Sequence, residues 1–227
     1  MGTTIGDLLP FALGVAISPL PIVAVILMVL TPNAERNGSA FACGWIIGLI
    51  TAGGLTLALA EVADVGGDGT SSDISAAIML VLGFVLIGLV ARRRWIRLEP
   101  VDGDQPDLPK WMSGIDRMSA FGTFGLAFMF AGVKPKNLIL AVGAGLTIAR
   151  ADLSTGESIT ALAIFVLLAS LTVAGPVVLF VLAGDRLRPT LDTWKAWLVA
   201  NNATEMSVLL LVFGVILIGK GVSGLTA

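Results

Sequence analysis

The sequence predicts an all-α integral membrane protein with six transmembrane helices in two inverted three-helix repeats, the first and fourth helices being broken at prolines. Composition is the first observation behind this prediction. Of 227 residues, 56% are hydrophobic and 13% are charged, whereas a soluble domain carries about 25% charged residues. Mean hydropathy is +0.94. The second observation is that the apolar residues form long runs, and about 20 helical residues span the hydrocarbon of a bilayer.

Six apolar runs are candidate spans, and they group into three segments of chain. The spans are residues 8–30, 39–60, 74–91, 120–149, 159–183 and 206–222. We expect a first three-span repeat over residues 1–91, a basic cytoplasmic loop with an interfacial helix over residues 92–119, and a second three-span repeat over residues 120–227. The first basic residue, Arg36, follows the first span. A signal peptide needs a cationic region before its apolar one, so we expect this span to be retained.

Basic residues predict the orientation, because cytoplasmic loops carry the excess of Lys and Arg. The side that holds both termini has two, Arg150 and Lys220. The connections between spans 1–2, 3–4 and 5–6 hold ten: Arg36, Arg92, Arg93, Arg94, Arg97, Lys110, Arg117, Arg186, Arg188 and Lys195. We therefore expect a multi-pass protein of the cell inner membrane with both termini extracytoplasmic.

Two stretches on the expected cytoplasmic side place apolar residues at helical spacing. Their stripes are Leu108, Trp111, Ile115 and Met118, and Leu187, Leu191, Trp194 and Leu198. Such helices either lie on the membrane surface or pack on the protein's own cytoplasmic face, and the pattern leaves both open.

A weak internal repeat relates the two halves. A shift of 116 residues places Pro19 on Pro135, and it also aligns Leu30 with Leu146 and Thr31 with Thr147. With three spans in each half, the halves must be inverted relative to each other, as in many secondary transporters.

The two aligned prolines lie near the middle of spans one and four. Proline removes an amide donor and clashes with the preceding turn, so we expect both helices to be interrupted there, with new half-helices that begin near Ile22 and Leu138. Matched interruptions in corresponding spans indicate a central binding site, although a single proline also occurs in ordinary kinks. The candidate substrate-binding residues are those of the two breaks: Ser18, Pro19, Pro21, Lys134, Pro135, Lys136 and Asn137.

Lys134 and Lys136 are charged residues deep within a span, where a charge is costly unless it is solvated or paired. No carboxylate lies nearby in the sequence. A cation beside the positive end of a half-helix favours an anion, so we expect these lysines to hold a phosphate, sulfate or carboxylate head group. The alternative is that they snorkel to an interface.

The second span has small residues every four positions, among them Gly44, Gly48 and Ala52. Such a face allows close helix packing, here within the chain or, as the alternative, in a homodimer.

Several function classes are disfavoured by composition. The chain has no histidine and one cysteine, Cys43, which removes the commonest general base and the commonest zinc ligands. It also has no phosphate-binding Gly-x-x-x-x-Gly-Lys-Ser/Thr loop. We expect no enzymatic activity, no cofactor, no metal site and no nucleic-acid partner.

Motifs in spans one, two and four resemble a known family. They are Gly14-Val15-Ala16-Ile17-Ser18-Pro19-Leu20-Pro21-Ile22, then Thr31-Pro32-Asn33-Ala34-Glu35-Arg36-Asn37-Gly38, Phe41-Ala42-Cys43-Gly44-Trp45 and Lys134-Pro135-Lys136-Asn137-Leu138. They resemble the Gap-like family of glycolipid-addressing and sulfolipid-addressing proteins of actinobacteria, within the LysE-type exporter superfamily. That family usually has Asn before the second proline, where this chain has Lys134.

The resemblance implies an exporter that moves envelope glycolipids from the inner membrane toward the cell surface. Membrane lipids and a lipid or glycolipid substrate are the implied partners, with lipid-synthesis or export proteins as further candidates. A LysE-like exporter of an amino acid or ion, and a non-transporting scaffold for lipid-export machinery, are the alternatives.

Overall fold

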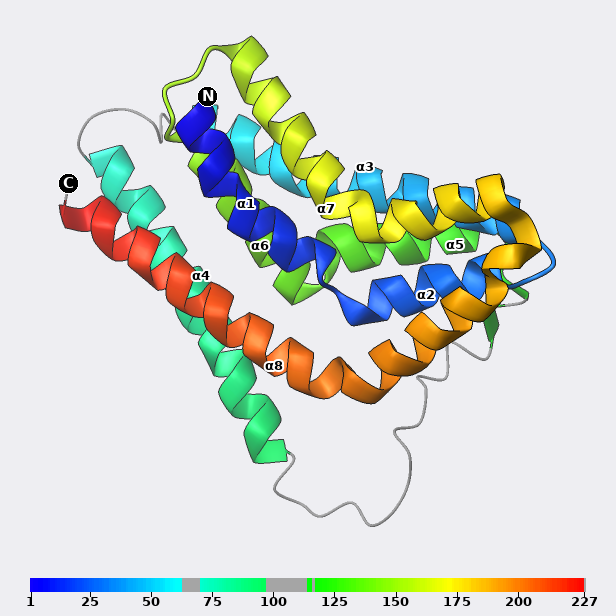
Figure 1. Ribbon diagram of the computed structural model, residues 1–227. Coiled ribbons are helices and arrows are strands. Elements are labelled where there is room, and N and C mark those ends of the chain that lie inside the picture. The colour runs from blue at the N-terminus through cyan, green and yellow to red at the C-terminus, as the bar shows by residue number, and fades with distance from the viewer. Residues whose placement is uncertain (63–69, 97–113, 116, 227) are drawn as a thin grey trace.

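A computed structural model describes residues 1–62, 70–96, 114–115 and 117–226 of the chain (Figure 1). Helices make up these residues, and no strand occurs among them. The elements are α1 (Gly2–Ala16), α2 (Pro19–Val29), α3 (Ala34–Val62), α4 (Thr70–Ile96), α5 (Ala120–Phe128), the π-helix η2 (Met129–Val133), α6 (Pro135–Ala149), α7 (Thr155–Ala183), the short 3-10 helix η3 (Gly184–Leu187) and α8 (Arg188–Thr226).

The helices that match the predicted spans are long and apolar. Four segments are sufficient alone to cross a membrane: Ala34–Val62, Asp73–Arg92, Thr155–Ala183 and Met206–Leu225. Two further pairs qualify together but are bent at a short break, α1 with α2 by 57° and the segment Ala120–Val133 with α6 by 60°. The described chain therefore has four candidate spans, or six if each bent pair is one span. The all-α membrane fold and the interruptions in spans one and four are confirmed.

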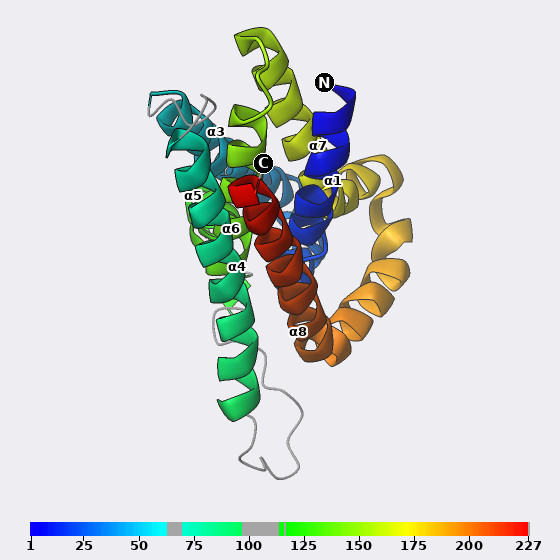
Figure 2. The ribbon, with the colours of Figure 1, turned by 90° about the vertical axis from the view of Figure 1, so that its left-hand side faces the viewer.

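The connections group at two opposite ends of the molecule. At one end, Arg188 Nη1 donates to Leu30 O at 3.1 Å and Asn37 Nδ2 donates to Met118 O at 3.4 Å. At the other end both termini lie together (Figures 1 and 2), and Lys220 pairs with Asp7 at 2.7 Å. The described residues of the connections from α2 to α3 and from α7 to α8, together with those just before α5, thus lie at one end, and the termini lie at the other.

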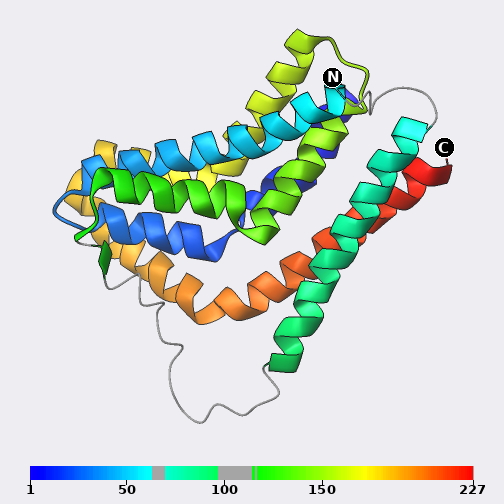
Figure 3. The same cartoon turned by 180° about the vertical axis from the view of Figure 1, so that it is seen from behind.

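Helices from the two halves of the chain pack on each other in corresponding ways. In the first half α1 and α2 contact α7, and in the second half α5 and α6 contact α3. Helix α4 and the later part of α8 pair on one side of the molecule (Figure 3). The two helices approach each other closely there: a Cβ added to Gly83 would lie only 2.8 Å from Gly214 O. The boundaries at residues 91 and 120 stay predictions.

The small face of α3 is used within the chain. A Cβ added to Gly48 would lie 2.9 Å from Ala131 Cβ, and one added to Gly132 would lie 2.9 Å from Gly48 O. Gly44 lies still closer to the backbone of Phe124. This face therefore packs on α5 and η2 within the chain, and a homodimer stays a prediction.

The second of the predicted interfacial stretches is the first part of α8 and continues into the last span (Figure 1). No glycine or proline interrupts the sequence between Pro189 and Gly214, so one helix of 39 residues forms where a separate stretch and span were expected. Leu191 is buried, whereas Trp194 and Trp197 are 44% and 58% exposed. One side of the stripe thus packs on the protein and the tryptophans remain at the surface.

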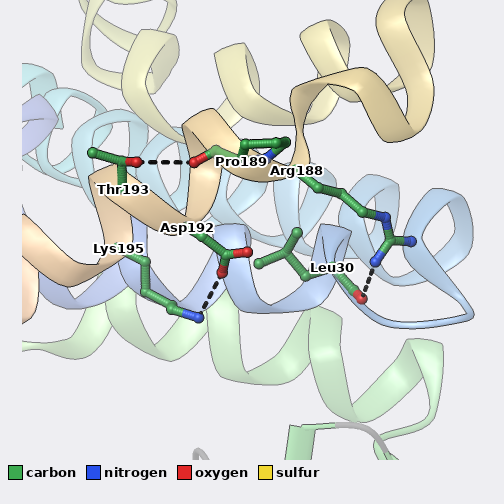
Figure 4. Close-up of polar contacts among 6 residues, drawn as sticks. All are labelled: Leu30, Arg188, Pro189, Asp192, Thr193 and Lys195. Atoms are coloured by element: carbon green, nitrogen blue, oxygen red, sulfur yellow. Dashed lines mark hydrogen bonds and ion pairs between the residues drawn. The ribbon is translucent and has the colours of Figure 1, made fainter.

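The start of α8 is fixed to the end of α2 by polar contacts (Figure 4). The Arg188 guanidinium donates to the carbonyl of Leu30, the C-cap of α2. Within the first turns of α8, Lys195 pairs with Asp192 at 2.8 Å and Thr193 Oγ1 donates to Pro189 O at 2.9 Å. In the other predicted interfacial stretch, Leu108 and Trp111 lie outside the described residues, and Ile115 is buried.

Candidate functional site

The first break lies between α1 and α2. Ser18 is the N-cap of α2 with an extended backbone, φ −118° and ψ 97°. Pro19 is the first helical residue, which is the position where proline is tolerated because its missing amide would have no helical partner anyway. The new half-helix therefore begins at Pro19, three residues before the expected start near Ile22. Because Pro21 also lacks an amide hydrogen, Leu20 carries the single N–H of positions 19–21.

The second break lies between η2 and α6 and has the same form. Lys134 is the N-cap of α6 with φ −60° and ψ 126°, the extended conformation that a following proline favours. Pro135 is the first residue of α6, again three residues before the expected start near Leu138. A turn of π-helix, Met129–Val133, precedes this break, and such turns are frequent at functional sites.

The two breaks meet through Lys136. Its side chain is 5% exposed, and its ammonium donates to Gly14 O at 2.7 Å, Ile17 O at 3.2 Å and Ser18 Oγ at 2.8 Å. The first two acceptors are carbonyls at the end of α1, where the helical ladder has stopped. Lys136 of the second half thus caps the broken helix of the first half.

Asn137 extends this network across the second break. Ser18 Oγ donates to Asn137 Oδ1 at 3.1 Å, and Asn137 Nδ2 donates to Phe130 O at 2.9 Å in the π-helical turn. Ser18 and Asn137 are both buried. A continuous chain of hydrogen bonds therefore runs from the end of α1, through Ser18 and Asn137, to the turn before α6.

Lys136 is held in the interior by helix geometry. A helix C-terminus carries the negative end of the helix dipole, and its last carbonyls need donors. No carboxylate among the described residues pairs with Lys136. The ammonium of Lys136 is not left open for an anion, because three protein oxygens already accept from it.

The seven predicted site residues differ in their burial and in the contacts that they make. Ser18, Lys136 and Asn137 are joined by hydrogen bonds, and Pro19 and Pro21 are buried beside them. Lys134 is half-buried with its Nζ 5.2 Å from the centroid of the Phe130 ring, and Pro135 is exposed. Whether any of these residues binds a substrate stays a prediction.

Thr172 of α7 is a further site residue that was not predicted from the sequence. Its Oγ1 donates to Ala16 O at 2.6 Å, which supplies the end of α1 with a further donor. A hydroxyl within an apolar span was the available signal, but it does not reveal which carbonyl it reaches.

The sequence matches a family model over most of its length. The family described as Sap, sulfolipid-1-addressing protein, matches residues 8–223. The chain belongs to this family. The Sap match includes both breaks and at least part of every helix of the described chain. No curated protein and no solved structure matches the chain significantly. Membership indicates a sulfolipid-related membrane protein, and the wider Gap-like and LysE-type relationships stay predictions.

This Sap-family chain also has an apolar groove beside the first break. Helices α3 and α7 enclose about 640 Å³ between residues that include Ile46, Ile50, Leu167 and Leu171. Ser170 is the one hydroxyl residue in its lining. Thr172, which contacts the end of α1, follows Leu171 directly, so the groove lies within a turn of helix of the break.

Proposed function

We propose that this protein is an inner-membrane transporter or flippase that exports an envelope glycolipid with an anionic or polar head group toward the cell surface. The observation that carries the proposal is the meeting of two broken helices, one from each half, at a buried polar network within the apolar core. In hydrocarbon, interrupted backbone is tolerated where protein covers it or where it lines a polar cavity. Broken helices that face each other at the interface of two repeats are typical of transporter binding sites.

An inverted arrangement of the two halves is part of the proposal. Its support is that exchanging α1 with α5 and η2, α2 with α6, α3 with α7, and α4 with α8 reproduces most of the helix contacts. Both breaks place proline as the first residue of the second half-helix. In this arrangement the breaks lie beside the symmetry axis, and a rocking motion of one half against the other would open the network alternately to each side.

In this proposal the head group binds at the second break, beside Lys134. Lys134 lies there, half-buried, and its charge is attractive to a sulfate, phosphate or carboxylate. The first turn of α6 adds the amides of residues 136 and 137, since Pro135 alone lacks one, and a helix N-terminus favours an anion. Lys136 then acts as the structural partner of α1 rather than as the primary anion ligand.

The apolar groove between α3 and α7 favours a lipid over a small solute. Both helices are candidate membrane spans, and most side chains that line the groove are apolar. A carrier of amino acids or ions has no use for a long apolar opening on its flank, whereas acyl chains attached to a head group in the core need one. We therefore assign the groove to the acyl chains of the exported lipid. The proposal requires no catalytic step.

A deletion strain tests the proposal through its lipids. Inner-membrane and surface lipids are compared between the parent, the deletion strain and the deletion strain complemented with Lys134→Gln or Lys195→Gln. Lys195 is the matched control, because it lies near the surface and pairs with Asp192 at the start of α8. We expect one glycolipid to be lost from the surface and retained inside on deletion, Lys134→Gln to restore export poorly, and Lys195→Gln to restore it fully. An unchanged lipid profile on deletion contradicts the proposal.

A further inference from the structure

A polar cleft opens at the end of the molecule that holds both termini, away from the two breaks. It encloses about 610 Å³ between the first turns of α1, the end of α6 and the end of α8. Its polar lining comes from residues that were not predicted to belong to any site: Thr3, Thr4, Asp7, Thr147, Arg150, Lys220 and Ser223.

The charge of this cleft suits an anion. Among its described lining residues, Arg150 and Lys220 are basic and Asp7 is acidic. The first turn of α1, with Thr3 and Thr4, adds the positive end of a helix dipole. Lys220 pairs with Asp7 at 2.7 Å, but the Asp7 side chain is 55% exposed, and such surface ion pairs contribute little to stability. An incoming oxyanion can therefore replace Asp7 on Lys220 at small cost.

The helices that line the cleft also reach the break. On α6, residues Lys136, Leu140, Gly143, Thr147 and Arg150 follow each other at intervals of three or four, which places them along one face of the helix. On α1, the same spacing leads from Asp7 through Phe11 to Gly14, whose carbonyl accepts from Lys136. Rows of residues along one face of α1 and one face of α6 thus lead from the cleft to the network between the breaks.

Four apolar side chains, which we call the plug, fill the space between the cleft and the network. They are Phe11, Leu140, Phe213 and Leu217, and each is between 0% and 6% exposed. A Cβ added to Gly14 would lie 2.7 Å from the Phe213 ring and 2.8 Å from Leu140. A Cβ added to Gly143 would lie 2.7 Å from the Phe11 ring. The two glycines therefore let the plug pack so tightly that no side chain fits beside it.

We propose that the cleft is a second head-group site on the export path, which takes the oxyanion of a sulfated or phosphorylated lipid after it has passed the plug. The inference rests on the proposed export function and adds a site to it. The structure then represents a state in which the cleft is open to the side of the termini and the plug separates it from the breaks. Lys220 and Arg150 hold the oxyanion, and Thr3 offers its hydroxyl to the sugar, whereas the Thr147 hydroxyl donates to Gly143 O at 2.8 Å.

A single-cysteine protein provides the test. Cys43→Ser removes the one native thiol, and Thr147→Cys places a thiol in the cleft, with Thr3→Cys as a second position in case the first variant folds poorly. The purified protein is placed in nanodiscs with sulfatide, with galactosylceramide, which differs by the sulfate, or with neither, and its labelling by a water-soluble maleimide is timed. We expect sulfatide to slow labelling several-fold, and galactosylceramide to leave it unchanged. Lys220→Gln should abolish the protection, whereas Asp7→Asn should produce it at lower sulfatide content.

Three outcomes would overturn the inference. Equal protection by both lipids would show apolar docking without an oxyanion site, and no protection at either position would show no lipid site at all. Protection by inorganic sulfate as strong as that by sulfatide would show a site for free anions. If export is lost in the deletion strain while labelling is insensitive to lipid, the cleft assignment is wrong and the proposed function stands.

Discussion

Replacing Lys136 with methionine tests the physical reasoning on which the site depends. Methionine keeps an unbranched side chain but leaves the Gly14 and Ile17 carbonyls and Ser18 Oγ without the ammonium that donates to them. Hydrogen bonds within membrane proteins average about 0.6 kcal/mol each, so three contribute about 2 kcal/mol. Counted instead as bonds to a charged group, about 1.5–3 kcal/mol each, they contribute about 4.5–9 kcal/mol. Removing the buried charge returns about 2.5–3.5 kcal/mol of this larger figure. The first route therefore gives a loss of about 2 kcal/mol, and the second gives a net loss of at least about 1 kcal/mol.

The assay is unfolding by sodium dodecyl sulfate in mixed micelles, followed by the fluorescence of the five tryptophans. Lys134→Met is the matched control, since it makes the same chemical change two positions away. Its Nζ has a cation–π contact with Phe130 at 5.2 Å, and the loss expected for such a contact near the surface is below about 1 kcal/mol. If Lys136→Met is as stable as the parent, or if both variants lose the same amount, the ammonium does not cap α1 and the account of the breaks is refuted.

Three further predictions concern packing, the contact between α8 and α2, and orientation. Gly44→Ala should lower the free energy of unfolding by about 1–3 kcal/mol, because its Cβ would overlap the Phe124 carbonyl. Gly125→Ala, which meets nothing within 4 Å, should raise it by up to about 1 kcal/mol in the same titration. Arg188→Gln should increase amide hydrogen exchange in η3 and the first turn of α8, because the bond to Leu30 O is lost; unchanged exchange would argue against that anchor. Alkaline phosphatase fused to either terminus should be active in intact cells, and an inactive fusion at either end would reverse the proposed orientation.

Much of the membrane fold could be predicted because its signals are local. A run of apolar residues long enough to span hydrocarbon needs no knowledge of its neighbours, and proline marks a helix interruption wherever it lies. The starts of α2 and α6 were expected three residues late, because proline was treated as a break within a helix rather than as its first residue. The continuity of α8 was missed for a similar reason. A polar stretch without glycine or proline can continue a helix beyond the membrane, and polarity alone does not end it.

The site was only partly predictable, because its contacts join residues more than a hundred positions apart. Ser18, Lys136 and Asn137 were selected from the two breaks separately, and their direct hydrogen bonds depend on how α1 meets α6. Lys136 was expected to bind an anionic head group, because no carboxylate lies near it in the sequence. The acceptors are backbone carbonyls, which every residue carries and which become available only where a helix stops.

The capping of α1 by Lys136 constrains how the proposed transporter can open. If α1 moves away from α6, the carbonyls of Gly14 and Ile17 lose their donor, and unsatisfied backbone groups in hydrocarbon cost several kcal/mol each. The separation is therefore unfavourable unless something else donates to those carbonyls. The hydroxyls of a sugar can do so, whereas a bare alkyl sulfate has an anion but no donor. Under the proposed function, opening of the break should therefore depend on a glycosyl head group. In a single-cysteine protein with Ser18→Cys, sulfatide should accelerate maleimide labelling and hexadecyl sulfate, which has no hydroxyl, should not; equal acceleration by both would show that charge alone opens the break.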